Sequence, residues 1–222
     1  MNRSKLTYFV PVLGLFAMAA RWLLYALGTD DRGLLVSHHP AGYAALLLTV
    51  LTAAAVWFAQ VPERTLRSTA VPSLALGLGL LVDSGGTGSL FFTLSRYGAA
   101  VILAAQALYA FQKKKSPSGF SAGLCICLIL RLIGSYQLWS RVPQIQNYLF
   151  ALLSGLCLAA FAYQQAAGEA KLGSPKWCFR FALMGCFLCM AASIGVRVQP
   201  VYLLFALWLY AQALCPVPEE AQ

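Results

Sequence analysis

Long apolar blocks run through this sequence, separated by short loops rich in glycine, proline and charged residues. A helix needs about 20 consecutive apolar residues to cross about 30 Å of hydrocarbon, because it rises about 1.5 Å per residue. The blocks have this length and lack the periodicity of a half-buried strand or helix in a soluble domain. The sequence therefore predicts an all-α integral membrane protein with eight transmembrane helices, at residues 7–28, 41–60, 68–84, 89–111, 119–138, 146–165, 177–195 and 199–216.

The third predicted span is the shortest, and it contains Pro72, Gly77 and Gly79, which weaken a helix. Its length leaves open whether it crosses the whole bilayer. Omitting it would move the Lys113–Lys115 cluster to the opposite side of the membrane, so the distribution of basic residues favours eight spans over seven.

Composition agrees with a lipid environment. Hydrophobic residues make up 60% of the 222 residues and charged residues only 10%, whereas soluble domains carry about 25% charged residues. The net charge is +9, but the basic residues lie mostly in short loops, without a basic helix or an aromatic-interleaved patch. We therefore expect contact with anionic lipid headgroups and no nucleic-acid partner.

The basic residues of the loops predict the orientation, because cytoplasmic loops carry an excess of lysine and arginine. An N-in/C-in arrangement gives the larger set to the cytoplasm and the smaller to the outside, which predicts an integral protein of the plasma membrane. The cytoplasmic set is Arg3, Lys5, Arg64, Arg67, Lys113, Lys114, Lys115, Lys171, Lys176 and Arg180, and the outer set is Arg32, Arg141 and Arg197.

The two halves of the chain, residues 1–112 and 113–222, resemble each other. Matches of leucine and alanine mean little in an apolar chain, but several polar residues also correspond: Tyr43 with Tyr148, Gln60 with Gln165, Gln106 with Gln212, and Arg21 with Arg131. Four spans in each half would make both halves face the same way, as a parallel tandem repeat about an axis along the membrane normal. We expect one membrane domain whose halves meet at a central interface.

Four ionisable residues fall in the predicted outer half of the spans: Arg21, Asp83, Arg96 and Arg131. A charged side chain near the bilayer centre costs at least about 2.5 kcal/mol, so it is rare unless it faces protein or water. One interpretation is an outward-facing site in which Arg21 and Arg131 bind an anion, since the planar guanidinium can bond two oxygens at once. The alternative is an interhelical ion pair of Asp83 with one arginine, while the others reach to the headgroups.

Gln106 and Gln212 form a secondary polar pair nearer the predicted cytoplasmic side. Amide side chains in spans often hydrogen-bond between helices. The pair is therefore interpreted as a packing contact, with a gate on a transport route as the alternative.

No pattern for catalysis or for a metal is present. The only histidines, His38 and His39, have no partner at ligand spacing, and the closest cysteine pair on one helix face, Cys186 and Cys189, supplies half of a structural zinc site. There is no serine–histidine–acid set, no pair of intramembrane aspartates and no His-Glu-x-x-His helix. We expect no cofactor, no metal and no enzymatic activity.

The stretch 131–165 resembles a group of bacterial multi-span membrane proteins of unassigned function. The similar residues are Trp139-Ser140, Pro143 and the run Gln146 to Phe150. The resemblance implies a bacterial membrane and no particular site residue. The residues themselves suggest a transporter-like or small-anion-binding protein with its site between the halves. The alternative is a non-catalytic accessory or assembly subunit whose partners are other membrane subunits.

Overall fold

The computed structural model describes residues 6–29, 35, 39–61, 68–83, 89–112, 117, 119–139, 148–195 and 198–215. Within these residues the chain forms eight α-helices and no β-strand, which confirms the all-α prediction. Each predicted span corresponds to one helix. The helices are α1 (Leu6–Leu27), α2 (Pro40–Phe58), α3 (Ala70–Val82), α4 (Leu90–Phe111), α5 (Gly119–Trp139), α6 (Leu149–Glu169), α7 (Pro175–Ala192) and α8 (Pro200–Leu214).

Five helices are long and apolar enough to cross a membrane: α1, α2, α4, α5 and α6. The helices α3 and α8 are apolar but shorter; the 13 residues of α3 span only about 20 Å at 1.5 Å per residue. Two basic residues, Lys176 and Arg180, occupy the first two turns of α7. The chain is thus suited to a membrane, while the crossing of all eight helices and their orientation stay predictions.

Local sequence signals explain several helix starts. Proline is the first residue of α2, α7 and α8, a position where its missing N–H costs nothing. His39 caps α2 by accepting a hydrogen bond from a backbone N–H of the first turn, and Ser89 does the same for α4.

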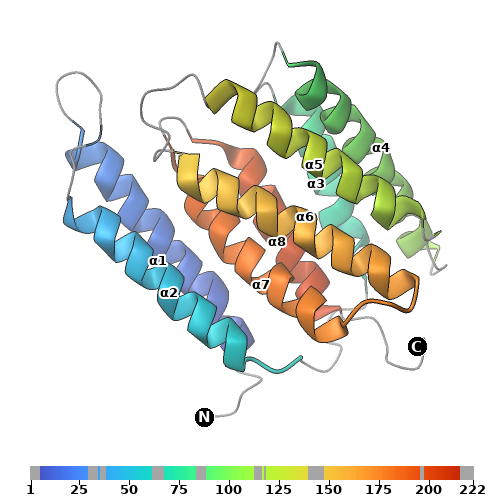
Figure 1. Ribbon diagram of the computed structural model, residues 1–222, viewed down its shortest axis with the longest axis horizontal. Coiled ribbons are helices and arrows are strands. Elements are labelled where there is room, and N and C mark those ends of the chain that lie inside the picture. Colours follow the sequence, from blue (N-terminus) through green and yellow to red (C-terminus); the bar gives the residue numbers. More distant parts are fainter. Residues whose placement is uncertain are drawn as a thin grey trace.

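Six helices form a closed ring, because each of α3, α4, α5, α6, α7 and α8 packs against the next and α8 packs against α3. The pair α1–α2 lies outside this ring, at the left of Figure 1, and both of its helices pack against α7. In consequence α7 contacts α1, α2, α6 and α8, and it is the helix with the most buried residues.

Trp208 of α8 lies inside the ring and is fully buried. Its indole Nε1 donates a hydrogen bond to Oγ of Ser73 on α3 over 3.1 Å. The ring of Phe161 on α6 meets the indole edge-on, with centroids 5.3 Å apart. One side chain thus joins three helices of the ring and satisfies its only polar group inside it.

The α1–α2 pair approaches the ring closely at one point. A Cβ atom added to Gly14 of α1 would lie 2.6 Å from Sδ of Met190 on α7. Only three residues of α2 are buried, Ala45, Thr52 and Val56, and large apolar side chains such as Phe16 and Leu47 are exposed. Exposed apolar faces of this extent suit contact with lipid or with another apolar surface.

The packing between the two predicted halves runs through a few helices. The α1–α2 pair contacts α7 of the second half. In the same way α3 contacts α8, and α4 contacts α5. Within each half the first two and the last two helices are packed side by side. The tandem repeat stays a prediction.

Candidate functional site

Three of the four predicted site residues meet at one end of the ring, around Asp83. This residue directly follows the last residue of α3, and its carboxylate Oδ2 lies 2.6 Å from Nη2 of Arg131 on α5. The two side chains are only 14% and 12% exposed. The ion pair therefore joins α3 to α5 in a largely water-excluded setting, as the interhelical alternative in the sequence analysis proposed.

Arg96 of α4 completes this group. Its Nη1 donates a hydrogen bond to the backbone carbonyl of Asp83, and its Nη2 donates to the hydroxyl of Tyr97 over 2.8 Å. The carbonyls at a helix end lack partners within the helix, so Arg96 also caps α3. We call Asp83, Arg96 and Arg131 the arginine–aspartate cluster. The cluster contains two guanidinium groups and one carboxylate, of which only that of Arg131 is paired with the carboxylate, so these three residues carry one positive charge in excess.

Aromatic side chains enclose Arg131. Its guanidinium carbon lies 4.4 Å from the ring centroid of Phe92 on α4 and 5.7 Å from that of Phe205 on α8. Both rings are buried, and an aromatic face attracts a cation. The ion pair is therefore held inside the ring of helices, and not directed at lipid.

Tyr202 of α8 is a site residue that sequence analysis missed. It is buried, its ring centroid lies 6.5 Å from that of Phe205, which contacts Arg131, and it is near enough to Arg131 and Asp83 to be affected by their charges. Cys189 of α7 also lies within electrostatic range of Arg131. No sequence pattern singles out these two residues, because a tyrosine or a cysteine is common in a membrane span and only the closed ring brings them to the cluster.

Two N–H groups of the cluster have no acceptor. Nη1 of Arg131 and Nε of Arg96 are buried and form no hydrogen bond with the described residues. Leaving a buried donor without a partner costs about 1–3 kcal/mol, and more for a charged group. The cluster thus combines an excess positive charge with unused donors, which is the chemistry that recognises an anion.

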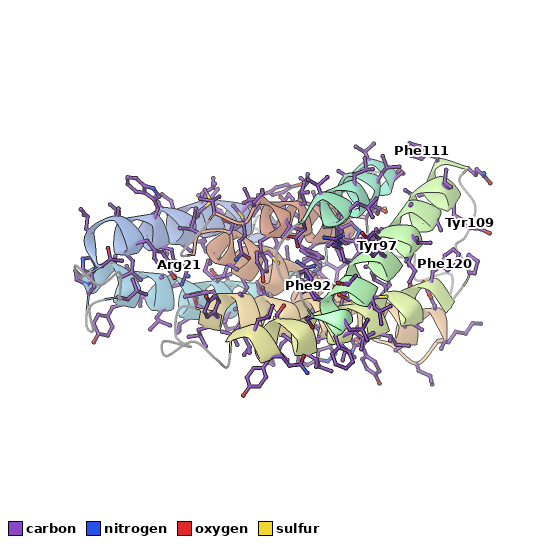
Figure 2. The ribbon with its side chains drawn as sticks, turned by 90° about the horizontal axis from the view of Figure 1, so that it is seen from above. Arg21, Phe92, Tyr97, Tyr109, Phe111 and Phe120 are labelled. Atoms are coloured by element: carbon purple, nitrogen blue, oxygen red, sulfur yellow. The ribbon has the colours of Figure 1, made fainter. Side chains whose placement is uncertain are left out.

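Arg21 lies apart from the cluster. Its Nε donates to the carbonyl of Ile194 at the end of α7 over 2.9 Å, and its Nη2 lies 3.1 Å from the hydroxyl of Tyr25. The ring of Phe150 on α6 lies 4.7 Å from the guanidinium carbon. Figure 2 shows Arg21 well separated from Phe92, whose ring contacts Arg131. Each arginine contacts the other half of the chain, Arg21 through Phe150 and Ile194 and Arg131 through Phe92 and Asp83.

The two glutamines lie on different helices of the ring. Gln106 is buried on α4 and Gln212 is half-buried on α8. The helix α3 packs against both α4 and α8 and so lies between them in the ring. Their pairing therefore stays a prediction.

The chain offers little for a metal. Among the described residues no group of three histidine, cysteine or acidic side chains could hold an ion. All seven cysteines are free thiols.

No protein-family model, curated protein or solved structure matches the chain. The chemistry of the arginine–aspartate cluster therefore carries the functional interpretation.

Proposed function

We propose that this chain is a transporter-like integral membrane protein that binds a small anion at the arginine–aspartate cluster. The observation that carries the proposal is the buried Nη1 of Arg131, which finds no acceptor in the described part of the chain although Nη2 of the same guanidinium is paired with Asp83. An anion at this edge would accept the unused hydrogen bond and balance the excess charge.

The cluster favours a singly charged anion. Two guanidinium groups against one carboxylate leave a single positive charge, and the Asp83 carboxylate repels a second negative charge brought next to it. Nitrate, formate and acetate combine one charge with a planar pair of oxygens, which suits the edge of a guanidinium. We therefore expect these ions to bind better than phosphate or sulfate.

The location of the cluster supports a site between the two halves. Asp83 and Arg96 belong to residues 1–112, while Arg131 and Tyr202 belong to residues 113–222. Transporters built from two repeats commonly bind their substrates at the interface of the repeats. A plasma membrane, most simply that of a bacterium, and the N-in/C-in orientation are part of the same proposal.

Binding of an anion panel tests the proposal. We expect formate and nitrate to raise the unfolding temperature of the protein purified in mild detergent. This rise should level off as the anion concentration increases. Arg131→Gln should abolish this response, because it removes both the charge and Nη1. Lys114→Gln, a charge removal in a loop that belongs to neither group of arginines, serves as the control and should leave the response unchanged.

Uptake of the same labelled anions into proteoliposomes then separates binding from transport. Saturable uptake that disappears in Arg131→Gln supports a transporter, while binding without uptake supports a binding protein. An Arg131→Gln protein that stays folded and keeps the wild-type anion response would refute the site.

An accessory or assembly subunit without a substrate is the second candidate. It is favoured by the exposed face of the α1–α2 pair, of which α2 buries only three residues. This face could be covered by another membrane subunit. Purification in a mild detergent distinguishes the two functions, since a stoichiometric partner supports the accessory role and a self-contained protein argues against it.

A further inference from the structure

Arg180 contacts the rings of two tryptophans where α2 ends and α7 begins. The guanidinium carbon of Arg180 on α7 is 4.3 Å from the ring centroid of Trp57 and 5.0 Å from that of Trp177. Its Nη2 donates a hydrogen bond to the carbonyl of Trp57 over 2.8 Å. Trp177 also stacks on Phe181, with centroids 5.9 Å apart. Packing thus fixes the direction of the guanidinium.

This group lies at the opposite end of α7 from the contact with Arg21. That contact is to Ile194, just beyond the last residue of α7, whereas Arg180 lies in the second turn of the helix. The distribution of basic loop residues predicts that this end of the helix faces the cytoplasm.

Two basic residues precede Arg180 closely in the chain, Lys171 just before α7 and Lys176 in its first turn. Lys171 and Lys176 are exposed, and both tryptophans are accessible, Trp57 by 56% and Trp177 by 40%. Nε of Arg180 is buried and forms no hydrogen bond with the described residues. We call Trp57, Lys171, Lys176, Trp177 and Arg180 the tryptophan–arginine patch.

We propose that the tryptophan–arginine patch binds the phosphate headgroup of an anionic phospholipid. Tryptophan is enriched at the level of the headgroups, where its ring is half in hydrocarbon and its N–H is in water. Basic residues near an anionic leaflet attract it electrostatically. The three cations are opposite in charge to the headgroup of such a lipid, and the exposed Phe58 and Leu172 offer apolar contacts to its acyl chains. This inference does not depend on the anion site at the other end of the ring.

Lipid binding to the purified protein tests the inference. Native mass spectrometry would count the molecules of dioleoylphosphatidylglycerol and dioleoylphosphatidylcholine that stay bound when each lipid is titrated into the detergent-solubilised protein. We expect a preference for phosphatidylglycerol. Lys176→Gln and Arg180→Gln should each lower the preference for phosphatidylglycerol about fivefold, which is the effect of one positive charge near an anionic membrane surface.

Two further variants separate the patch from general lipid contact. Trp57→Leu should weaken the binding of phosphatidylglycerol. Trp22→Leu should leave this binding unchanged, because Trp22 is equally exposed but lies near the end of α1, whereas Trp57 of the patch lies at the end of the antiparallel α2. Lys176 is exposed, so Lys176→Gln tests the patch even if Arg180→Gln fails to fold. Equal binding of the two lipids by the wild-type protein, or an unchanged preference in Lys176→Gln, would overturn the inference.

Discussion

The carboxylate of Asp83 and the guanidinium of Arg131 form an ion pair between α3 and α5, two helices that each pack against α4. The pair therefore joins two non-adjacent members of the ring across their common neighbour. Because both side chains are mostly shielded from water, each one stabilises the charge of the other, and neither can be removed without consequence for the one that remains.

Replacing one partner of this pair should destabilise the protein more than replacing both. Asp83→Asn leaves Arg131 charged without its carboxylate, and the loss of one partner of a buried pair costs about 3 kcal/mol. The double variant Asp83→Asn/Arg131→Gln removes both charges and should recover a large part of this loss. Unfolding in mixed detergent micelles measures the three free energies. A double variant as unstable as the sum of the single variants would contradict the expectation.

The hydrogen bond between Trp208 and Ser73 should show energetic coupling. Ser73→Ala leaves the buried indole N–H without an acceptor, and Trp208→Phe removes the donor together with contacts to Phe161. A double-mutant cycle should give a coupling free energy of about 0.6 kcal/mol, the average for hydrogen bonds between helices in a membrane, and at most about 1.7 kcal/mol. Additive effects of the two substitutions would argue against the bond.

The close approach of α1 to α7 should make Gly14 sensitive to size. Gly14→Val places a side chain where Met190 now lies, and overpacking of this kind costs about 1–3 kcal/mol. Met190→Ala frees space at that point, so the double variant should be more stable than Gly14→Val alone. The test is the unfolding midpoint of the three variants. A neutral Gly14→Val would mean that α1 is free to move away from α7.

Labelling of introduced cysteines tests the predicted orientation. In a cysteine-free background, His38→Cys should react with a membrane-impermeant maleimide on intact cells, and Lys114→Cys should react only after the membrane is permeabilised. The expectation follows from the excess of basic residues assigned to the cytoplasm. The reverse pattern of labelling would invert the chain in the membrane, and labelling of both positions from one side would change the number of spans.

The sequence predicted the helices well, because the length of an apolar block is a local property. The third block illustrates both the success and its limit, since residues 68–84 contain one helix, but that helix has only 13 residues. The sixth helix ends at Glu169, beyond the predicted 146–165. Its extra turn contains a carboxylate that accepts a hydrogen bond from Ser121 of α5, a contact that hydropathy does not reveal.

The site was only partly predictable, because it depends on which helices are neighbours. Three residues stand out in the sequence because a charged side chain in an apolar block is energetically costly. They are Asp83, Arg96 and Arg131, and the structure brings them together. Arg21 stands out for the same reason but belongs to another group of contacts. Arg180 was interpreted only as a topology signal, although Trp177 close to it in the same span could have indicated a headgroup contact. The approach of Trp57 from α2 required the fold.

The central place of α7 has a consequence for biogenesis. About half of the chain lies between the end of α2 and the start of α7, so a ribosome releases the first hairpin long before its packing surface exists. During that interval the buried stripe of α1, including the guanidinium of Arg21, has no protein to contact at the positions that α7 later occupies. If the chain inserts into a membrane as predicted, we expect the nascent hairpin to need shelter from the insertion machinery or from lipid headgroups until the seventh helix arrives.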